Sequence, residues 1–449
     1  MKQYTLPSIL LLFTSLLFFS CREEQIVPVE IDVVFHIRND NHTAPLEVYI
    51  ENDTKEAKSY LWTFEGGEPA TSRDENPSVV VFRTPGEHLI SLEAWNEGDR
   101  KTYTQIIRVD SMVVAGFTTE VLANNYAPAE IIINNLSTGG TLYQWTFEGG
   151  IPSVYEGKNP PHITYPNEGT YLITLSVENG SSTFHAEQQI EVMPALDGDF
   201  EIIPSFEDED MEAPLRATFD VRLQGVETVL FTTEGGDINN AASTDASVFY
   251  PNPGIFVVTM TIGNGKETKQ ITQSIIVKPN NNLRTHSDIM LGINTAQETI
   301  GSCYSTKLRR MVKSQEIVTV DPAMIDIVYM GLNSNFSLNR FVSPDSALYT
   351  PLKPIQGGLH TKFINKQEEG NIYITPEQFI DMTNDDLIRR ISISALDYGW
   401  EPFEAIPIPR VVLFETADRR KGAIYIKKLI SAEKDNSYIL VDIKIQKND

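Results

Sequence analysis

Three stretches of the chain alternate residues suited to a protein interior with polar residues, and each follows a Pro-Gly or Glu-Gly turn. An alternation of period two is typical of a strand with one buried and one solvated face. We therefore expect a half-buried β-strand at each stretch. The alternate positions are His88, Ile90, Leu92 and Ala94; Tyr171, Ile173, Leu175 and Val177; and Phe256, Val258, Met260 and Ile262.

A six-residue segment precedes each of these strands. It reads Trp-Thr-Phe-Glu-Gly-Gly at 62–67 and at 145–150, and Phe-Thr-Thr-Glu-Gly-Gly at 231–236. The copies are 83 and 86 residues apart, which is a suitable length for one β-sandwich each. We expect Trp62, Trp145 and Phe231 in the sandwich cores and the Gly-Gly pairs in tight turns. The altered third copy predicts a looser core or a shifted boundary.

The hexapeptide and the later Pro-Gly strand resemble the marks of PKD domains, which are immunoglobulin-like sandwiches. The resemblance covers about residues 29–278. It implies a mainly β chain of three tandem immunoglobulin-like (PKD-type) β-sandwiches, expected at 29–110, 111–194 and 195–279. Pro279 and the Asn run at 280–282 then end the row.

The remaining residues, 280–449, have a mixed pattern that predicts an α+β C-terminal domain. Thr375, Pro376 and Gln378 form a helix start, and a second short helix is expected through Arg390. Strands are expected at 289–293, 325–330, 411–415, 423–430 and 438–445, the last two forming a hairpin. Segments such as 323–329 and 421–424 resemble a C-terminal module common in Bacteroidetes outer-membrane lipoproteins.

The N-terminus carries an apolar run from Leu6 to Phe19, which is too short to span a bilayer. The Ser20-Cys21 pair that follows resembles a Bacteroidetes lipobox, and an ordinary cleaved signal peptide is the alternative. The resemblance implies a lipoprotein signal peptide at 1–20, acylation of Cys21 (palmitate), a tether at 21–28 and an outer-membrane location. Arg22-Glu23-Glu24 is similar to the signal that exports such lipoproteins to the cell surface.

Charge is distributed unevenly. Residues 1–279 hold 16 Lys and Arg against 40 Asp and Glu, whereas residues 280–449 hold 20 against 21. The acidic N-terminal region repels nucleic acid and anionic membranes. We therefore expect that the protein has no nucleic-acid partner and that it contacts the membrane through its lipid alone. This region contains a cluster of acids that is either a calcium loop or a solvated loop, Glu207-Asp208-Glu209-Asp210 with Glu212.

The chain lacks the common catalytic signatures. A Ser-His-Asp site needs His286 or His360 near a serine, but no Gly-x-Ser-x-Gly elbow is present. Zinc-binding spacings and glycine-rich phosphate loops are also missing from the sequence. We therefore expect no enzyme activity, no cofactor and no metal.

A turn-rich loop carries the candidate ligand site. Tyr398, Trp400 and Phe403 are three aromatic residues in it, and exposed aromatic rings are what sugar binding requires. One hypothesis is a surface lipoprotein whose repeats present a carbohydrate-binding domain, capturing polysaccharide beside a TonB-dependent transporter. The alternative is a protein-interaction, surface-assembly or adhesion lipoprotein with no glycan ligand, in which Trp400 belongs to the core.

Overall fold

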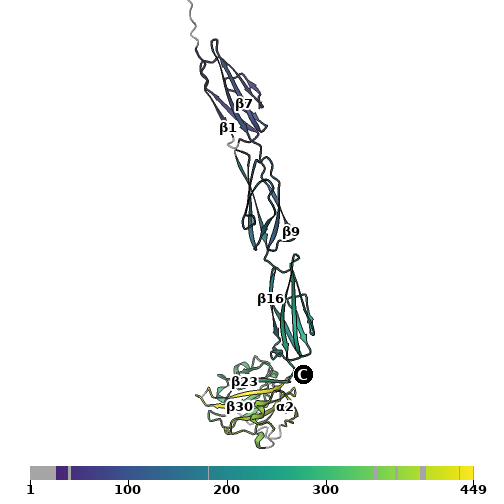
Figure 1. Cartoon of the computed structure of the whole chain (residues 1–449). Helices are drawn as coiled ribbons and strands as arrows, with labels where there is room; N and C mark the ends of the chain where they lie inside the picture. Colours follow the sequence, from purple (N-terminus) through teal and green to yellow (C-terminus); the bar gives the residue numbers. More distant parts are fainter. Residues whose placement is uncertain are drawn as a thin grey trace, which may run out of the picture.

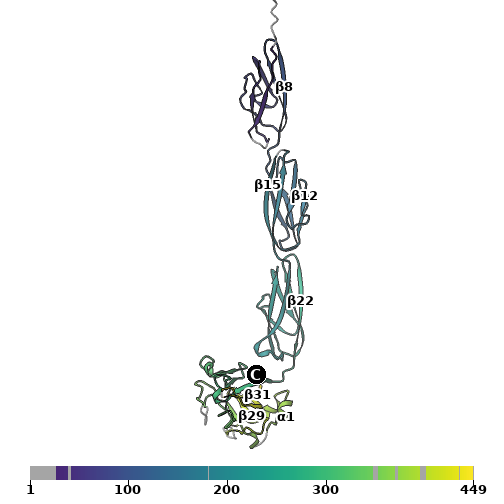
Figure 2. The same ribbon diagram turned by 90° about the vertical axis from the view of Figure 1, so that its left-hand side faces the viewer.

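The chain forms a row of three β-sandwiches with a separate domain at its end (Figure 1). The computed structural model describes residues 27–38, 42–180, 182–346, 352–369, 373–394, 401–433 and 435–447. A view turned by 90° shows the same end-to-end order (Figure 2). This architecture confirms the predicted fold class of three tandem immunoglobulin-like sandwiches followed by an α+β domain.

The first sandwich packs two four-stranded antiparallel sheets face to face, β1-β2-β6-β4 and β5-β3-β7-β8. Alternate residues of each strand point into one core, which holds Trp62, Phe64 and Leu92. Their burial confirms the period-two prediction. The strands are β1 (Val33–Ile37), β2 (Leu46–Asn52), β3 (Ser59–Phe64), β4 (Gly67–Glu68), β5 (Thr71–Ser72), β6 (Val80–Phe82), β7 (Gly86–Trp95) and β8 (Arg100–Val109).

The second sandwich repeats this plan with sheets β13-β10-β9 and β12-β11-β14-β15. Trp145 and Phe147 stack in its core with ring centres 6.1 Å apart, as Trp62 and Phe64 do at 6.0 Å in the first. The strands are β9 (Phe117–Leu122), β10 (Ala129–Asn135), β11 (Leu142–Phe147), β12 (Val154–Glu156), β13 (Ile163–Tyr165), β14 (Gly169–Glu178) and β15 (Thr183–Val192).

The third sandwich has sheets β16-β17-β20-β19 and β18-β21-β22. Phe231 replaces the tryptophan, and the freed space is filled by Phe219 and Phe200, whose ring centres lie 4.5 Å and 5.5 Å from it. The predicted looser core is therefore wrong for these residues. The elements are β16 (Asp197–Pro204), η1 (Phe206–Asp208), β17 (Leu215–Gln224), β18 (Thr228–Thr233), β19 (Asp237–Asn239), β20 (Ser247–Tyr250), β21 (Gly254–Gly263) and β22 (Thr268–Val277).

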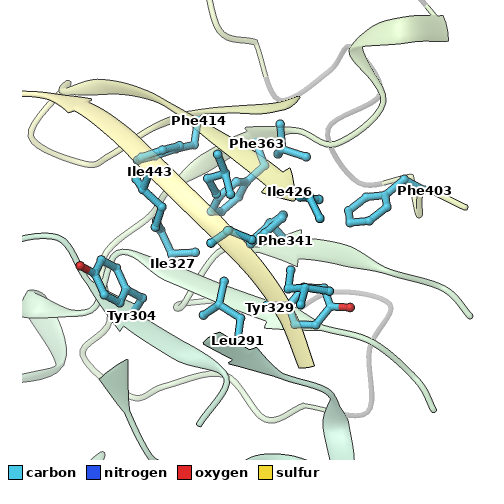
Figure 3. Packing of buried hydrophobic residues seen from close by; sticks show 14 of the residues in the cluster. Leu291, Tyr304, Ile327, Tyr329, Phe341, Phe363, Phe403, Phe414, Ile426 and Ile443 are labelled. Atoms are coloured by element: carbon cyan, nitrogen blue, oxygen red, sulfur yellow. The ribbon is translucent and has the colours of Figure 1, made fainter. Parts of the chain in front are cut away.

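The C-terminal domain packs a five-stranded sheet, β23-β31-β30-β29-β28, against a four-stranded sheet, β25-β24-β26-β27. Tyr304, Tyr329 and Phe341 fill the space between them together with Ile426 and Ile443 (Figure 3). The strands are β23 (Leu283–Gly292), β24 (Cys303–Ser305), β25 (Arg310–Val312), β26 (Ile327–Met330), β27 (Arg340–Val342), β28 (Lys362–Ile364), β29 (Arg410–Glu415), β30 (Lys421–Ile430) and β31 (Tyr438–Gln446).

Two short helices cover the other face of the five-stranded sheet. Helix α1 (Pro376–Asp381) begins with the predicted capping box, since the Thr375 side chain accepts a hydrogen bond from the Gln378 backbone. Helix α2 (Asp386–Arg390) has acids first and arginines last, as the helix dipole favours. No helix in the described parts of the chain has the length and apolar character needed to cross a bilayer.

Candidate functional site: a pocket on the C-terminal domain

The four-stranded sheet of the C-terminal domain has two apolar faces. Tyr304, Tyr329 and Phe341 point to the five-stranded sheet, and the residues before or after them point the opposite way. Those outward residues form a separate small cluster with Ile325 and Ile355. Loops cover this outer face where a second sheet or helix would normally do so. The outward strand residues are Cys303, Val312, Val328 and Val342.

The loops leave a pocket of about 690 Å³ over the outer face. This volume is in the range of small-ligand sites. Its apolar lining comes from the sheet and from two loops, residues 314–322 and 352–356. Its aliphatic and proline residues are Ile317, Val318, Val320, Pro322, Val328, Pro344, Leu352, Pro354 and Ile355, and its polar ones are Gln297, Ser302, Ser314, Ser343, Lys353 and Gln356.

The side chains around the pocket give it an apolar surface and an inert thiol. Cys303 lies in its wall, and burial raises the pKa of the thiol to about 12, so the thiol stays protonated and unreactive at neutral pH. Val318 lies at the mouth and is 88% exposed. None of the described lining residues is aromatic. The pocket therefore offers an aliphatic surface, with Lys353 as its one cationic side chain among those residues.

Ser343, Asp345 and His360 meet beside the pocket. The Ser343 hydroxyl donates to Asp345, and Nδ1 of His360 lies 3.2 Å from Ser343 Oγ and 3.0 Å from Asp345 Oδ1. Burial opposes ionisation of Asp345, but the hydrogen bonds from Ser343 and His360 hold its pKa below the usual range. A catalytic relay needs the nucleophile and the carboxylate on opposite ring nitrogens. Here both share Nδ1, so this arrangement orders a turn and forms no such relay.

A second polar cluster is buried in the domain. Asp326 accepts hydrogen bonds from the backbone and hydroxyl of Thr306, and Arg420 donates to the same hydroxyl. Burial raises the pKa of Asp326 above its usual range in spite of these bonds. Nearby, the Tyr304 hydroxyl and His286 Nδ1 are hydrogen-bonded at 2.8 Å. Burial, with the nearby charge of Arg420, lowers the pKa of His286 to about 4.

The structure corrects the predicted role of one candidate site residue. Phe403 is fully buried, and its ring stacks 6.3 Å from Phe341 in the core of Figure 3. The guanidinium of Arg410 lies over the same ring, 4.8 Å from its centre. Phe403 is therefore a core residue, and the prediction that it contacts a ligand is wrong because its side chain is fully buried. Tyr398, Trp400 and the lipidation site Cys21 lie outside the described residues.

The pocket itself was not predicted from the sequence. Its lining comes from two loops without hydrophobic periodicity, so neither strand nor helix patterns mark it. Pro322, Pro344 and Pro354 are the only signal, because prolines end regular elements and are frequent in ordered loops.

Comparisons with known proteins agree with the fold of the first two repeats. Residues 34–109 and 114–192 match the PKD domain family. Human Polycystin-1 is 26% identical over 194 residues, which covers 38% of this chain and 4% of that protein. The chain thus spans only a small part of the relative it matches.

Similar solved structures are more distant. A DUF4466 family protein from Parabacteroides merdae aligns with 76% of this chain and 100% of its own, at 14% identity and a TM-score of 0.27. The I67–I69 fragment of titin aligns with 56% of this chain and 99% of its own, at 11% identity and a TM-score of 0.32. The chain therefore contains two repeats that match the PKD domain family, followed by a third sandwich and a C-terminal domain outside the matched residues.

Proposed function

We propose that this protein is a non-enzymatic cell-surface lipoprotein, anchored through Cys21, whose repeats present the C-terminal domain for binding. PKD and other immunoglobulin-like repeats are consistent with a spacer or an adhesion-type extracellular protein. The observation that carries the proposal is the position of the C-terminal domain, which has the aliphatic pocket, at the end of the row.

Two classes of ligand follow from different parts of the domain. Capture of a glycan for a neighbouring TonB-dependent transporter rests on Tyr398 and Trp400. Binding of a protein partner rests on the pocket, because its lining is aliphatic and sugars stack on aromatic rings. Among the described residues, the aliphatic pocket favours an apolar group of a protein partner over a sugar.

Two variants separate these classes. Val318→Glu places a charge at the pocket mouth, and its 88% exposure means that folding is unaffected. Trp400→Ala removes the aromatic face proposed for glycan binding. Ile380→Glu, at a 60% exposed position on α1, is the matched control for adding a charge elsewhere on the domain.

The experiment has two arms. Soluble protein is applied to a glycan array, and intact cells are cross-linked to measure how much partner protein co-purifies. Loss of array binding with Trp400→Ala alone supports glycan capture. Loss of the cross-linked partner protein with Val318→Glu alone supports the protein partner. If neither signal exists in the native protein, both binding proposals are wrong.

A further inference from the structure

The acidic segment of the third repeat, residues 205–214 between β16 and β17, lies at the junction with the C-terminal domain. Asp208 faces its own repeat, where it accepts hydrogen bonds from the Ser205 hydroxyl and the Arg216 backbone. The other acids face the C-terminal domain: Glu207, Glu209, Asp210 and Glu212. Figure 1 places the C-terminus of the chain at the same junction. Glu207 and Glu209 keep most of the exposure expected of a solvated loop, at 65% and 59%, whereas Glu212 is buried against the C-terminal domain. The described residues form no cluster that could hold a calcium ion.

Arg309 of the C-terminal domain forms ion pairs with this acidic segment. Its guanidinium lies 2.8 Å from Glu209, 3.1 Å from Glu207 and 4.0 Å above the ring of Phe206. The side chain of Arg309 is 14% exposed, whereas Glu207 and Glu209 are 65% and 59% exposed, so only the guanidinium side of these contacts is shielded from water. Such shielding strengthens ion pairs and cation–π contacts relative to those on an open surface. Arg284 adds further contacts with Glu207 and Asp210.

Lys447, near the end of β31, makes the most buried contact of the junction. Its amine lies 2.6 Å from Glu212 and 2.7 Å from Asp210. The side chains of Lys447 and Glu212 are 12% and 9% exposed. Removing one partner of so buried a pair leaves an uncompensated charge, which is strongly destabilising.

The connecting residues 280–282 are held from both sides. The backbone N–H of Asn281 donates to Glu212 at 2.9 Å, on the side of the repeat. Asn282 donates to Asp385 at 2.9 Å, on the side of the C-terminal domain. The segment that the sequence marks as a linker is thus anchored at both ends and has little freedom to act as a hinge.

The other two junctions are different. Between the first and second repeats, the Asn179 amide donates to the carbonyl of Ser111, in the short connection that follows Asp110. The second and third are joined by Asn124 and Lys266, which donate to backbone carbonyls across the junction. In the described parts of the chain, every ion pair between different domains lies at the third junction.

We infer that the acidic segment is a docking surface for the basic face formed by Arg284, Arg309 and Lys447, and that it fixes the orientation of the C-terminal domain. The third repeat then serves as a dedicated platform, and the first two repeats act as the spacer.

The test measures the distance between the two domains in the full mature chain with Cys21→Ser. Spin labels are placed at Thr232→Cys and Lys428→Cys, both exposed, while buried Cys303 stays unlabelled. The joint variant combines Glu207→Gln, Glu209→Gln, Asp210→Asn and Glu212→Gln. The matched control removes four exposed acids elsewhere on the same repeat, through Glu201→Gln, Asp220→Asn, Glu234→Gln and Asp245→Asn.

We expect one narrow distance distribution in the native chain and in the control, and a distribution about twice as wide or wider in the joint variant. A charge swap, Arg309→Glu with Glu209→Arg, should restore the narrow distribution that Arg309→Glu alone broadens, which separates loss of the ion pair from misfolding. A broad native distribution, or a joint variant as narrow as the control, would overturn the inference.

Discussion

Gly149 and Tyr171 lie in direct contact in the second repeat. A Cβ added to Gly149 would lie 2.3 Å from Cε1 of Tyr171. The first and third repeats have the same relationship, between Gly66 and His88 and between Gly235 and Phe256. The first glycine of each Gly-Gly pair has φ near +70°, which favours glycine. The hexapeptide and the Pro-Gly strand therefore recur together, because an aromatic ring at the start of the strand packs against the Gly-Gly turn of the hexapeptide.

Gly149→Ala should consequently destabilise the second repeat by about 2–4 kcal/mol, from backbone strain and the clash with Tyr171. Gly116→Ala is the matched control in the same repeat, because Gly116 has no neighbour within 4 Å of an added Cβ. Urea unfolding measures both. Equal stability of the two variants would mean that the turn relaxes without cost.

Phe403→Ala should destabilise the C-terminal domain by about 3–5 kcal/mol, because it opens a cavity between Phe341 and Arg410. Ile406→Ala is the control, since Ile406 is 80% exposed in the same loop. Thermal unfolding distinguishes the two. A Phe403→Ala domain that melts with the native one would restore the prediction of an exposed ring.

His286 should make the C-terminal domain sensitive to acid. Its pKa is about 4 in the folded state against an ordinary 6.5, so between these pH values the unfolded chain binds the proton and the folded chain does not. Folding stability contributed by this group is therefore fully present above pH 6.5 and falls as pH drops to about 4, by about 3 kcal/mol in total.

Urea unfolding at pH 7, 5.5 and 4.5 measures this dependence. His286→Gln removes the titrating ring, so the difference between it and the native chain isolates the histidine from the carboxylates that also titrate. Parallel pH profiles for the two chains would show that His286 is not held neutral by burial.

The three sandwiches could be predicted from the sequence because alternating burial depends on residues that are close together in the chain. Alternating burial along β7, β14 and β21 follows directly from period two, and Trp62 and Trp145 are buried as expected. Phe231 was harder to interpret. Phe200 and Phe219, which fill the space of the missing tryptophan, lie on β16 and β17, and the hexapeptide alone does not identify them.

The third junction and the core of the C-terminal domain depend on contacts that are distant in sequence. Glu207 and Glu212 are conspicuous as acids, but their partners Arg309 and Lys447 are 102 and 235 residues away. The same is true of Phe403. Its aromatic neighbours in the sequence favoured an exposed loop, but in the structure its ring packs against Phe341 of β27. Composition shows which residues are unusual, and only the three-dimensional arrangement shows what they face.

Protease treatment of intact cells tests whether the C-terminal domain is displayed on the cell surface, as the proposed function requires. Cells are treated with proteinase and probed for the C-terminal domain, beside lysed cells and cells expressing Cys21→Ala. We expect the domain to be digested on intact native cells, and we expect Cys21→Ala to abolish both fatty-acid labelling and surface display. A domain that resists proteinase on intact cells but is digested after lysis would contradict this expectation.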